Sequence, residues 1–491
     1  MVVSNELRTS ELPTEGLELG AFEQAGQEAF ARLSRDFNPV HLDAVVARRT
    51  LFGQPIVHGM HLVLRALETV SGLLPSVAYA RIIARFHRPV FLGERLFLQV
   101  RPTENGLDLT YVSDGTQLTT ISLVARRPEF GDPDWSMAVD HCRTSPREFS
   151  IEEMQGYQGV VGLPQKPAEI RAFFPAASQT YGTNRIANLL GITYAIGMEV
   201  PGLHSMFATL TVNLLDGVGS DLQFLAKRVT PKLSHVQLQF QSEALSGSSE
   251  TFVRPRVGAI DFATCRKAVT DGEFRGRCAL IVGGSRGLGL LTANLLGAGG
   301  AEVVITYRSG EEEAKAAIAV MRENGVAASA IRLDVASPAE AFAGLGSDGI
   351  SVTDMFYFAT PHIFVRKKRL FEDHLLDGFI SNYTTNFLSV VEEAKQLAKG
   401  GLAVFYPSSD ALNNPLKDLA EYYVAKMAGE AVCEMLNRYD DEVNVTVSRL
   451  PRLPTDQTAT LMNVATDDPV AVLLDICRTM KSRRPNLPNT P

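Results

Sequence analysis

The sequence predicts an α+β part made of two related copies, followed by an α/β part with a doubly wound parallel sheet. The chain has 491 residues, more than one hydrophobic core usually organises. Segment 165–240 repeats features of the first hundred residues, and both copies contain strands of alternating hydrophobicity. From about residue 275, short apolar strands enclose a glycine-rich turn. We expect domains at 1–147, 148–262 and 274–491.

Composition and charge narrow the functional classes. Hydrophobic residues make up 45% of the chain and charged residues 21%, which is typical of globular proteins. A net charge of −8 does not favour binding to nucleic acid or to an anionic membrane. Met1–Gly16 is polar and acidic rather than a signal peptide, and no apolar run approaches membrane-spanning length. We therefore expect a cytoplasmic protein without nucleic-acid or membrane partners.

The five cysteines are far apart and form no C-x-x-C pair. They are Cys142, Cys265, Cys278, Cys433 and Cys477. This spacing predicts neither a disulfide framework nor a metal site.

The first copy places a carboxylate, Asp36, and an imidazole, His41, on either side of an Asn-Pro turn. Downstream, residues 52–60 read F-G-Q-P-I-V-H-G-M, and Gly59 in this segment can open a helix. Elimination or addition of water beside a thioester carbonyl needs one group for the α proton and another for the β hydroxyl. A backbone N–H at a helix start can hold the enolate oxygen.

These two segments resemble the hydratase/dehydratase motif of the MaoC-like family, which has a hot-dog fold and acts on (R)-3-hydroxyacyl thioesters. The resemblance implies that Asp36 and His41 are the catalytic acid/base pair and that Gly59 donates to the enolate oxygen. For Gly59 an ordinary turn residue is the alternative. An isolated Asp36 would instead be a cap or turn residue, and an isolated His41 a solvated histidine. His58 is expected to brace the helix entry rather than to react.

The second copy is a degraded repeat. An offset of 143 residues pairs Gly59 with Gly202, Asp36 with Gln179 and His41 with Asn184. Downstream, strand 96–100 has its counterpart in strand 235–240. Neither side-chain amide can exchange a proton near neutral pH, so this copy is expected to lack acid/base chemistry. Two such copies resemble a double hot-dog, in which two sheets each wrap around a central helix. The second copy would either complete an acyl-binding tunnel or serve only as a packing partner.

Residues 278–306 read as strand, glycine-rich turn, helix and strand, the unit that binds dinucleotides. Glycines let the backbone approach a pyrophosphate at the helix N-terminus. The G-x-x-x-G-x-G spacing resembles the short-chain dehydrogenase/reductase family, whose sheet is Rossmann-like. The resemblance implies cofactor contacts from Gly283, Ser285, Arg286, Gly287, Leu288, Gly289, Arg308, Ser309, Asp334, Val335, Tyr422, Lys426 and Thr455.

Cofactor choice follows from charge. NAD-preferring enzymes place an acid after the second strand, whereas residues 306–309 read T-Y-R-S. The guanidiniums of Arg286 and Arg308 would suit a 2′-phosphate, so NADP(H) is the expected cofactor. An ordinary surface arginine is the alternative for Arg308.

Tyr422 and Lys426 match the family's catalytic Tyr-x-x-x-Lys pair, and Ser409 precedes Tyr422 by the family's usual interval. Residues four apart share a helix face, so the ammonium can lower the pKa of the phenol. The resemblance also implies that Asn382 holds a proton-relay water.

The reductase part departs from its family in three places. The usual Asn-Asn-Ala-Gly turn reads Y-F-A-T at 357–360, and the usual Pro-Gly after the sixth strand reads Pro451-Arg452. No seventh strand is recognisable before the chain ends. The family's tetramer is therefore in doubt, and a homodimer is the expected assembly.

Together these features predict a bifunctional enzyme acting on coenzyme A or acyl-carrier-protein thioesters. It would reduce a 3-oxoacyl thioester with NADPH and dehydrate the (R)-3-hydroxyacyl product to a trans-2-enoyl thioester. One alternative runs the opposite way, by hydration and NAD-linked oxidation. Another is an acyl-carrier-binding scaffold with only one active module.

Overall fold

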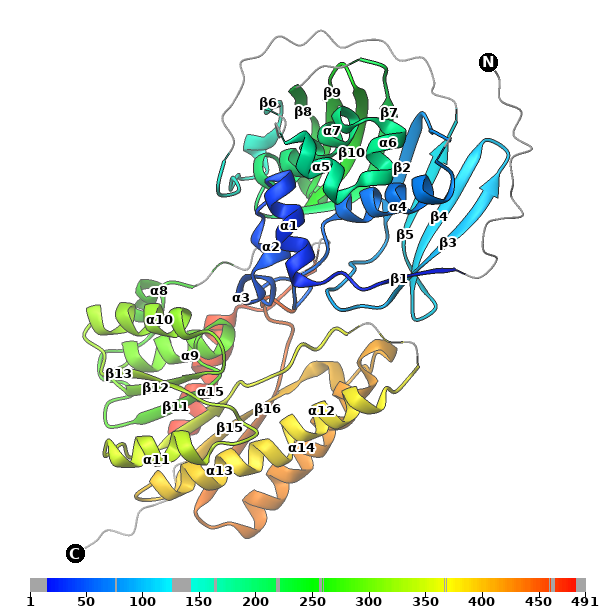
Figure 1. Ribbon diagram of the computed structural model, residues 1–491. Helices are drawn as coiled ribbons and strands as arrows, with labels where there is room; N and C mark the ends of the chain where they lie inside the picture. Colours follow the sequence, from blue (N-terminus) through cyan, green and yellow to red (C-terminus); the bar gives the residue numbers. More distant parts are fainter. Residues whose placement is uncertain are drawn as a thin grey trace, which may run out of the picture. The chain divides into compact units, whose positions relative to one another are not determined.

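The computed structural model describes residues 16–482 except 76, 126–142, 163–165, 218–220, 256–257, 259, 366, 368, 459 and 461–463. Segment 1–15 and Cys142, which entered the expectations above, lie outside this part. The chain divides near residue 255 into two compact units (Figure 1). The three domain bounds expected from the sequence stay a proposal. Among the described residues, no helix has both the length and the apolar character needed to cross a membrane.

The first unit is built on one antiparallel sheet, to which both copies contribute strands. Among the described residues this sheet has ten strands. In chain order the strands are β1 (Leu17–Gly20), β2 (Arg81–Phe86), β3 (Leu96–Thr103), β4 (Gly106–Ser113), β5 (Thr116–Val124), β6 (Gln158–Gly162), β7 (Ser205–Leu214), β8 (Asp221–Thr230), β9 (His235–Gln241) and β10 (Leu245–Val253). Their order across the sheet is β1-β3-β4-β5-β2-β7-β10-β9-β8-β6. The two copies therefore meet where β2 pairs with β7, for example at Ile82 and Val212.

Each half of this sheet holds one central helix, α4 (Gly59–Leu73) in the first copy and α7 (Thr183–Tyr194) in the second (Figure 1). Both helices are buried in a hydrophobic core that they share with the sheet. Strand β9 shows the period-two pattern expected of a half-buried strand, because every second residue is buried. This architecture confirms the double hot-dog predicted from the sequence.

The register predicted for the repeat is wrong. The strand order makes β8, not β9, the counterpart of β3. Helix α7 begins at Thr183, so Thr183 occupies the place of Gly59, while Gly202 lies in the turn that enters β7 with φ +73°. Sequence 163–182 between β6 and α7 is shorter than sequence 21–58 between β1 and α4. The second copy lacks most of the segment that carries Asp36 and His41 in the first, so a single offset cannot align both halves.

The second unit is a six-stranded parallel sheet in the order β13-β12-β11-β14-β15-β16. Its strands are β11 (Cys278–Val282), β12 (Glu302–Tyr307), β13 (Ala328–Arg332), β14 (Asp354–Tyr357), β15 (Leu402–Ser409) and β16 (Val443–Leu450). Its helices are α8 (Phe262–Ala268), α9 (Gly287–Ala298), α10 (Glu311–Glu323), α11 (Ala339–Ser347), α12 (Asp373–Tyr383), α13 (Thr385–Leu397), α14 (Ala420–Tyr439) and α15 (Pro469–Ser482).

Separate hydrophobic cores cover the two faces of this parallel sheet. One core holds residues of α8, α9, α10 and α15, and the other holds residues of α11, α12, α13 and α14. Strands β11 and β12 are apolar on both faces, as is usual in a sheet covered by helices on both sides. The predicted Rossmann-like doubly wound sheet is confirmed, and no strand follows β16 within the described residues.

A buried ion pair joins the central strands to the last helix. The guanidinium of Arg277 donates to both carboxylate oxygens of Asp354, at 2.6 and 2.9 Å, and to the carbonyl of Cys477 in α15. Both charged side chains are almost fully buried. The bidentate geometry satisfies a charge pair that would otherwise be costly at this depth.

Candidate active sites

The first site is built on the turn after α1 (Gln24–Ser34). Arg35 adopts the left-handed conformation, with φ 62°, and redirects the chain so that Asp36 is buried. Asn38 caps the short helix α2 (Pro39–Leu42) by accepting from the backbone N–H of Val40. Its Nδ2 donates at 3.1 and 3.0 Å to the carbonyls of Gly197 and Gly202 in the second copy. The turn is therefore fixed by both copies.

Asp36 and His41 meet in this buried turn with altered proton affinities. His41 Nδ1 donates to the carbonyl of Ile56 at 2.8 Å, which leaves the Nε2 lone pair available. Burial lowers the pKa of His41 to about 4 and raises the pKa of Asp36 to about 7. Near neutral pH, His41 can therefore accept a proton while Asp36 can hold one. Because the two groups are close, their proton affinities belong to the pair.

His58, which the sequence predicts to brace the helix entry, also contacts both members of the pair. Its ring stacks on that of His41 with centroids 3.8 Å apart, and its Nε2 donates to the carbonyl of Asp36 at 3.1 Å. Ligand atoms of Asp36, His41 and His58 lie within 4.8 Å of one another, a spacing that could also suit a metal ion. However, Nε2 of His58, the atom nearest the carboxylate, must carry a proton to donate to that carbonyl. The arrangement therefore fits acid–base chemistry better.

Gly59 opens α4, so its N–H has no acceptor within the helix. A Cβ atom at this position would lie 2.9 Å from the ring of Phe207 and 3.1 Å from the ring of Phe86. These rings come from β7 and β2, one from each copy, with centroids 4.7 Å apart. A side chain here would displace these rings, so glycine fits the position best, and apolar rings from both copies lie beside an amide suited to an enolate oxygen.

The second copy also reaches Asp36 directly. Thr193 in α7 donates from Oγ1 to Oδ2 of Asp36 at 2.7 Å. A Cβ atom on Gly197, in the π-helical turn η3 (Ala195–Glu199), would lie 2.3 Å from Oδ1 of the same carboxyl. Sequence reasoning missed both residues, because no motif marks a threonine and a glycine so far along the chain. Gln179 and Asn184, which the sequence paired with Asp36 and His41 as their counterparts in the second copy, lie on α6 (Pro175–Tyr181) and at the start of α7.

The second site lies at the carboxyl edge of the parallel sheet. After β11, Gly283 and Gly287 have φ of +81° and +57°, which glycine adopts without strain. A Cβ atom on Gly289 would lie 2.3 Å from the carbonyl oxygen of Gly283. The turn then leads directly into the N-terminus of α9. This bare backbone is a cradle of the kind that accepts a pyrophosphate, so the residues present fit a dinucleotide.

The four residues predicted to be catalytic here lie on α12, β15 and α14. Ser409 ends β15 and hydrogen-bonds to the phenol of Tyr422; burial raises the pKa of Tyr422 and this bond opposes the rise. Lys426, one turn further along α14, donates to the carbonyl of Pro407 at 2.6 Å. Asn382 donates to the carbonyl of Ala359 at 3.1 Å.

The carbonyl of Asn382 accepts from the hydroxyl of Tyr357 at 2.9 Å. Tyr357 begins the segment that departs from the family's Asn-Asn-Ala-Gly turn. One lone pair of the Asn382 carbonyl is therefore already used by a side chain of this departing segment.

Lys426 is buried against aromatic rings. Its Nζ lies 3.8 Å from the ring centroid of Tyr383 and 4.8 Å from that of Tyr406. Within the described part of the chain it pairs with no carboxylate, because the nearby Glu430 binds Ser408 and Arg449. Burial lowers the pKa of Lys426 to about 7. Tyr383 was not predicted, and only its place next to Asn382 could have indicated it.

The residues predicted to hold the cofactor differ in their surroundings. Arg286 forms an ion pair with Asp456, which follows Thr455 in the loop after β16, at 2.8 Å. Arg308 is exposed directly after β12. Asp334, beyond β13, accepts from the backbone N–H of Ala336. The other predicted contacts, Ser285, Leu288, Ser309 and Val335, lie in the segments that follow the ends of β11, β12 and β13.

Two residues of the loop after β16 were missed by sequence reasoning, Asp456 and Gln457. Gln457 accepts from the N–H of Ile363 at 2.7 Å, so this loop is tied to the segment after β14. The sequence predicted only Thr455 from this loop, because neither neighbour belongs to a motif.

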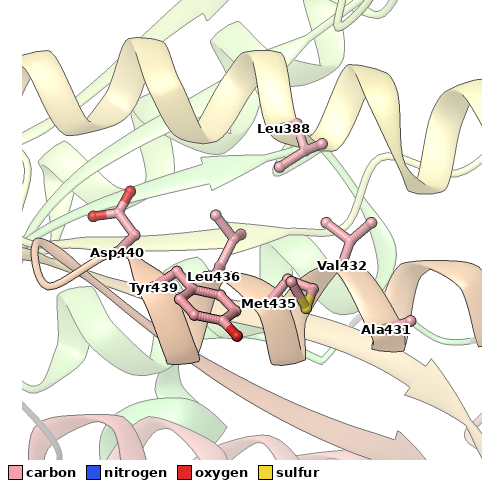
Figure 2. A pocket seen from close by; sticks show the side chains of 7 residues that line it. All are labelled: Leu388, Ala431, Val432, Met435, Leu436, Tyr439 and Asp440. Carbon is pink, nitrogen blue, oxygen red and sulfur yellow. The ribbon is translucent and has the colours of Figure 1, made fainter.

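A separate apolar groove with a volume of about 440 Å³ lies between α13 and α14 (Figure 2). It is lined by Leu388, Ala431, Val432, Met435, Leu436, Tyr439 and Asp440. These residues belong to the C-terminal half of α14 and to α13, whereas Tyr422 lies in the first turn of α14. The groove is therefore not the candidate catalytic site.

Comparison with known proteins separates the chain into the same two parts. Residues 5–117 match the family described as "MaoC like domain", and residues 277–468 match "short chain dehydrogenase". The (R)-specific enoyl-CoA hydratase of Aeromonas caviae is 40% identical over 84 residues, 17% of this chain and 63% of the relative. The chain thus spans less than two thirds of that relative's length.

Relatives of the second part are more distant. A short chain dehydrogenase/reductase, nsrJ, of Aspergillus novofumigatus is 26% identical over 186 residues, 36% of this chain and 69% of the relative. The crystal structure of angucycline C-6 ketoreductase LanV with bound NADP is 19% identical, with a TM-score of 0.39. It covers 43% of this chain and 90% of its own. This chain carries a MaoC-like domain at its N-terminal end and a short-chain dehydrogenase domain at its C-terminal end.

Proposed function

We propose that this protein is a bifunctional acyl-thioester enzyme, which reduces a 3-oxoacyl thioester to the (R)-3-hydroxyacyl form and dehydrates that product to a trans-2-enoyl thioester. The observation that carries the proposal is the pair Asp36 and His41. Burial leaves His41 unprotonated and lets Asp36 keep a proton near neutral pH, beside the free amide of Gly59. A hydration or dehydration needs one group that accepts a proton and one that donates a proton, and this pair supplies both.

In the hydration direction, Nε2 of His41 takes a proton from water as the water oxygen bonds to Cβ. Asp36 gives its proton to Cα, and the N–H of Gly59 holds the oxygen that carries the enolate charge. Dehydration is the reverse: the Asp36 carboxylate takes the α proton, and His41 protonates the departing hydroxyl. The pair carries one proton in both directions, so only its location changes.

In the reductase unit, bound NADPH would supply a hydride to the carbonyl carbon of the substrate. Tyr422 donates its phenolic proton to the carbonyl oxygen, while the Ser409 hydroxyl helps to orient that oxygen. Lys426 places its ammonium near the phenol and favours loss of the phenolic proton. The glycine cradle at Gly283 and Gly289 leaves the backbone accessible to the cofactor phosphates.

The reductive direction is supported by charge at the end of β12. Residues 306–309 contain Arg308 and no acid, which favours a 2′-phosphate over a free ribose hydroxyl. Arg286 is already paired with Asp456, so Arg308 is the stronger candidate for this contact. The acyl carrier is coenzyme A or an acyl-carrier protein. The alternative function is the opposite direction, hydration followed by NAD-linked oxidation.

The test is incubation of the purified chain with acetoacetyl thioesters of coenzyme A and of acyl-carrier protein. NADPH and NADH are supplied in parallel, and products are identified by mass. We expect gain of two hydrogens followed by loss of water, with NADPH preferred. Oxidation of a 3-hydroxyacyl thioester with a preference for NAD⁺ would support the alternative, hydration followed by oxidation. Thioester binding without turnover in the reductase half would support the scaffold alternative.

A homodimer is the assembly that we propose. The outer face of α14 exposes Val424, Met427, Met435 and Tyr439, beside the apolar groove of Figure 2. A second copy of the chain would bury this face. Sedimentation should show a dimer for the wild type and a monomer for Met435→Glu; an unchanged dimer would place the contact elsewhere.

A further inference from the structure

The second hot-dog copy has no acid/base pair, yet it contributes a buried hydroxyl to the site of the first. Thr193 lies in α7, is 4% exposed, and donates from Oγ1 to Oδ2 of Asp36 at 2.7 Å. The other carboxylate oxygen, Oδ1, accepts from the backbone N–H of Asn38 at 3.2 Å. Each carboxyl oxygen thus accepts one hydrogen bond: Oδ2 accepts from the second copy and Oδ1 from the first.

The end of α7 is shaped to allow this contact. The helix continues into the π-helical turn η3, and Gly197 in that turn faces the carboxyl group so closely that no side chain fits there. π-Helical turns are uncommon, and those that do occur are frequently found at functional sites. The carbonyl of Gly197 also accepts from Asn38 Nδ2, so the same turn holds the loop and the carboxyl group.

We propose that Thr193 is a positioning residue for Asp36: the degenerate copy supplies the hydroxyl that orients the carboxyl group and sets its proton affinity. This inference rests on the proposed function, because it assigns Asp36 the acid/base role. It also gives the second copy a task beyond lining a tunnel or covering a sheet.

The sign of the effect follows from the groups that face the carboxyl group. The titratable groups near it are His58, which precedes α4, and His41 in α2. Arg254, which follows β10, lowers the pKa of His41 by its charge. The donors to the carboxyl group are Thr193 and the N–H of Asn38. A hydroxyl that donates to a carboxylate stabilises the charged form. Removing it should therefore raise the pKa of Asp36 further above its present value near 7.

The experiment compares pH profiles of crotonyl-thioester hydration for the full-length wild type, Thr193→Val and Thr193→Ser. Hydration requires a protonated Asp36, so the rate should fall as pH rises past the pKa of the pair. Valine keeps the shape of threonine without the hydroxyl. We expect the basic limb of Thr193→Val to move up by about one pH unit, as a hydrogen bond to a charged group implies. Thr193→Ser should restore the wild-type limb.

A matched control is Thr180→Val. Thr180 lies in α6 of the same copy, and its buried hydroxyl has no hydrogen-bond partner within the described part of the chain. Its profile should coincide with that of the wild type. A purely structural role for Thr193 would instead lower the rate of Thr193→Val without moving its limb, and that result would overturn the proposal.

A second readout does not depend on turnover. The carboxyl carbon of Asp36 can be titrated by NMR in protein labelled with 13Cγ-aspartate, with Asp36→Asn for assignment. The Thr193→Val titration should lie above that of the wild type. Coincident titrations would refute the inference even if hydration proceeds, whereas a wild type without hydratase activity would refute the proposed function itself.

Discussion

Lys426 shows how a single buried residue depends on its surroundings. Its ammonium faces the rings of Tyr383 and Tyr406 and donates to the carbonyl of Pro407. Among the described residues it forms no ion pair, and Glu430 stabilises its charge only from a distance. An aromatic face attracts a cation electrostatically, and more strongly where water is excluded. Burial nevertheless lowers the pKa of Lys426 to about 7, so its charge depends on these few contacts near neutral pH.

We predict that Tyr383→Leu narrows the pH range of reduction. Loss of the ring removes a contact of about 1–2 kcal/mol to the charged form, so the pKa of Lys426 should fall by about one unit. The basic limb of kcat/KM for 3-oxoacyl reduction should move to lower pH by that amount. Tyr383→Phe keeps the ring and should keep the wild-type limb. An unmoved limb in Tyr383→Leu would show that the ring does not hold the charge.

The cofactor preference can be tested at Arg308. A charge-assisted contact with a 2′-phosphate is worth about 1.5–3 kcal/mol, so Arg308→Ala should raise the KM for NADPH by about one to two orders of magnitude. The KM for NADH should barely change. Arg438→Ala, an exposed arginine in the last turn of α14, is the matched control. Equal losses for both cofactors in Arg308→Ala would contradict the assignment.

At the scale of elements, the sequence was most informative where one segment carries the whole pattern. The turn with Asp36 and His41, the glycine-rich turn before α9, and the pair on α14 all lie where the sequence predicts them. The repeat was harder to predict, because the segment before α7 is shorter than the one before α4, so no single offset aligns both halves. Thr193 and Gly197 could not be predicted, since their role arises from packing of α7 against a turn 157 or more residues away.

We predict that Gly197→Ala slows the hydratase without unfolding the protein. Its Cβ atom would lie 2.3 Å from Oδ1 and 2.5 Å from Oδ2 of Asp36, so the carboxyl group must move. A displacement of about 1 Å can cost about 10²-fold in rate, and hydration should fall by that amount. Gly26→Ala in α1 is the control, because no described residue outside its own helix backbone lies within 4 Å of its Cβ position. A fully active Gly197→Ala enzyme would show that the close approach is not needed.

At the scale of the whole molecule, the two units have separate hydrophobic cores and separate candidate sites. The fold class of each unit could be predicted because each uses a different hydrophobic period, alternating strands in one and wholly apolar parallel strands in the other. The proton affinities could not be predicted, since they are set by burial. Each reaction should therefore depend on its own unit alone.

The last prediction uses this separation. Asp36→Asn or His41→Ala should lower hydration of a crotonyl thioester by about 10² to 10⁴-fold, the usual contribution of one acid/base group. Both variants should oxidise NADPH with a 3-oxoacyl thioester at the wild-type rate. Tyr422→Phe should do the opposite, because the phenylalanine ring keeps the packing on α14 but has no proton to donate. Stopped-flow absorbance of NADPH and of the enoyl thioester measures the two steps in one sample. If Asp36→Asn also slowed reduction while its thermal unfolding stayed unchanged, the two sites would be coupled and independent chemistry in the two units would be wrong.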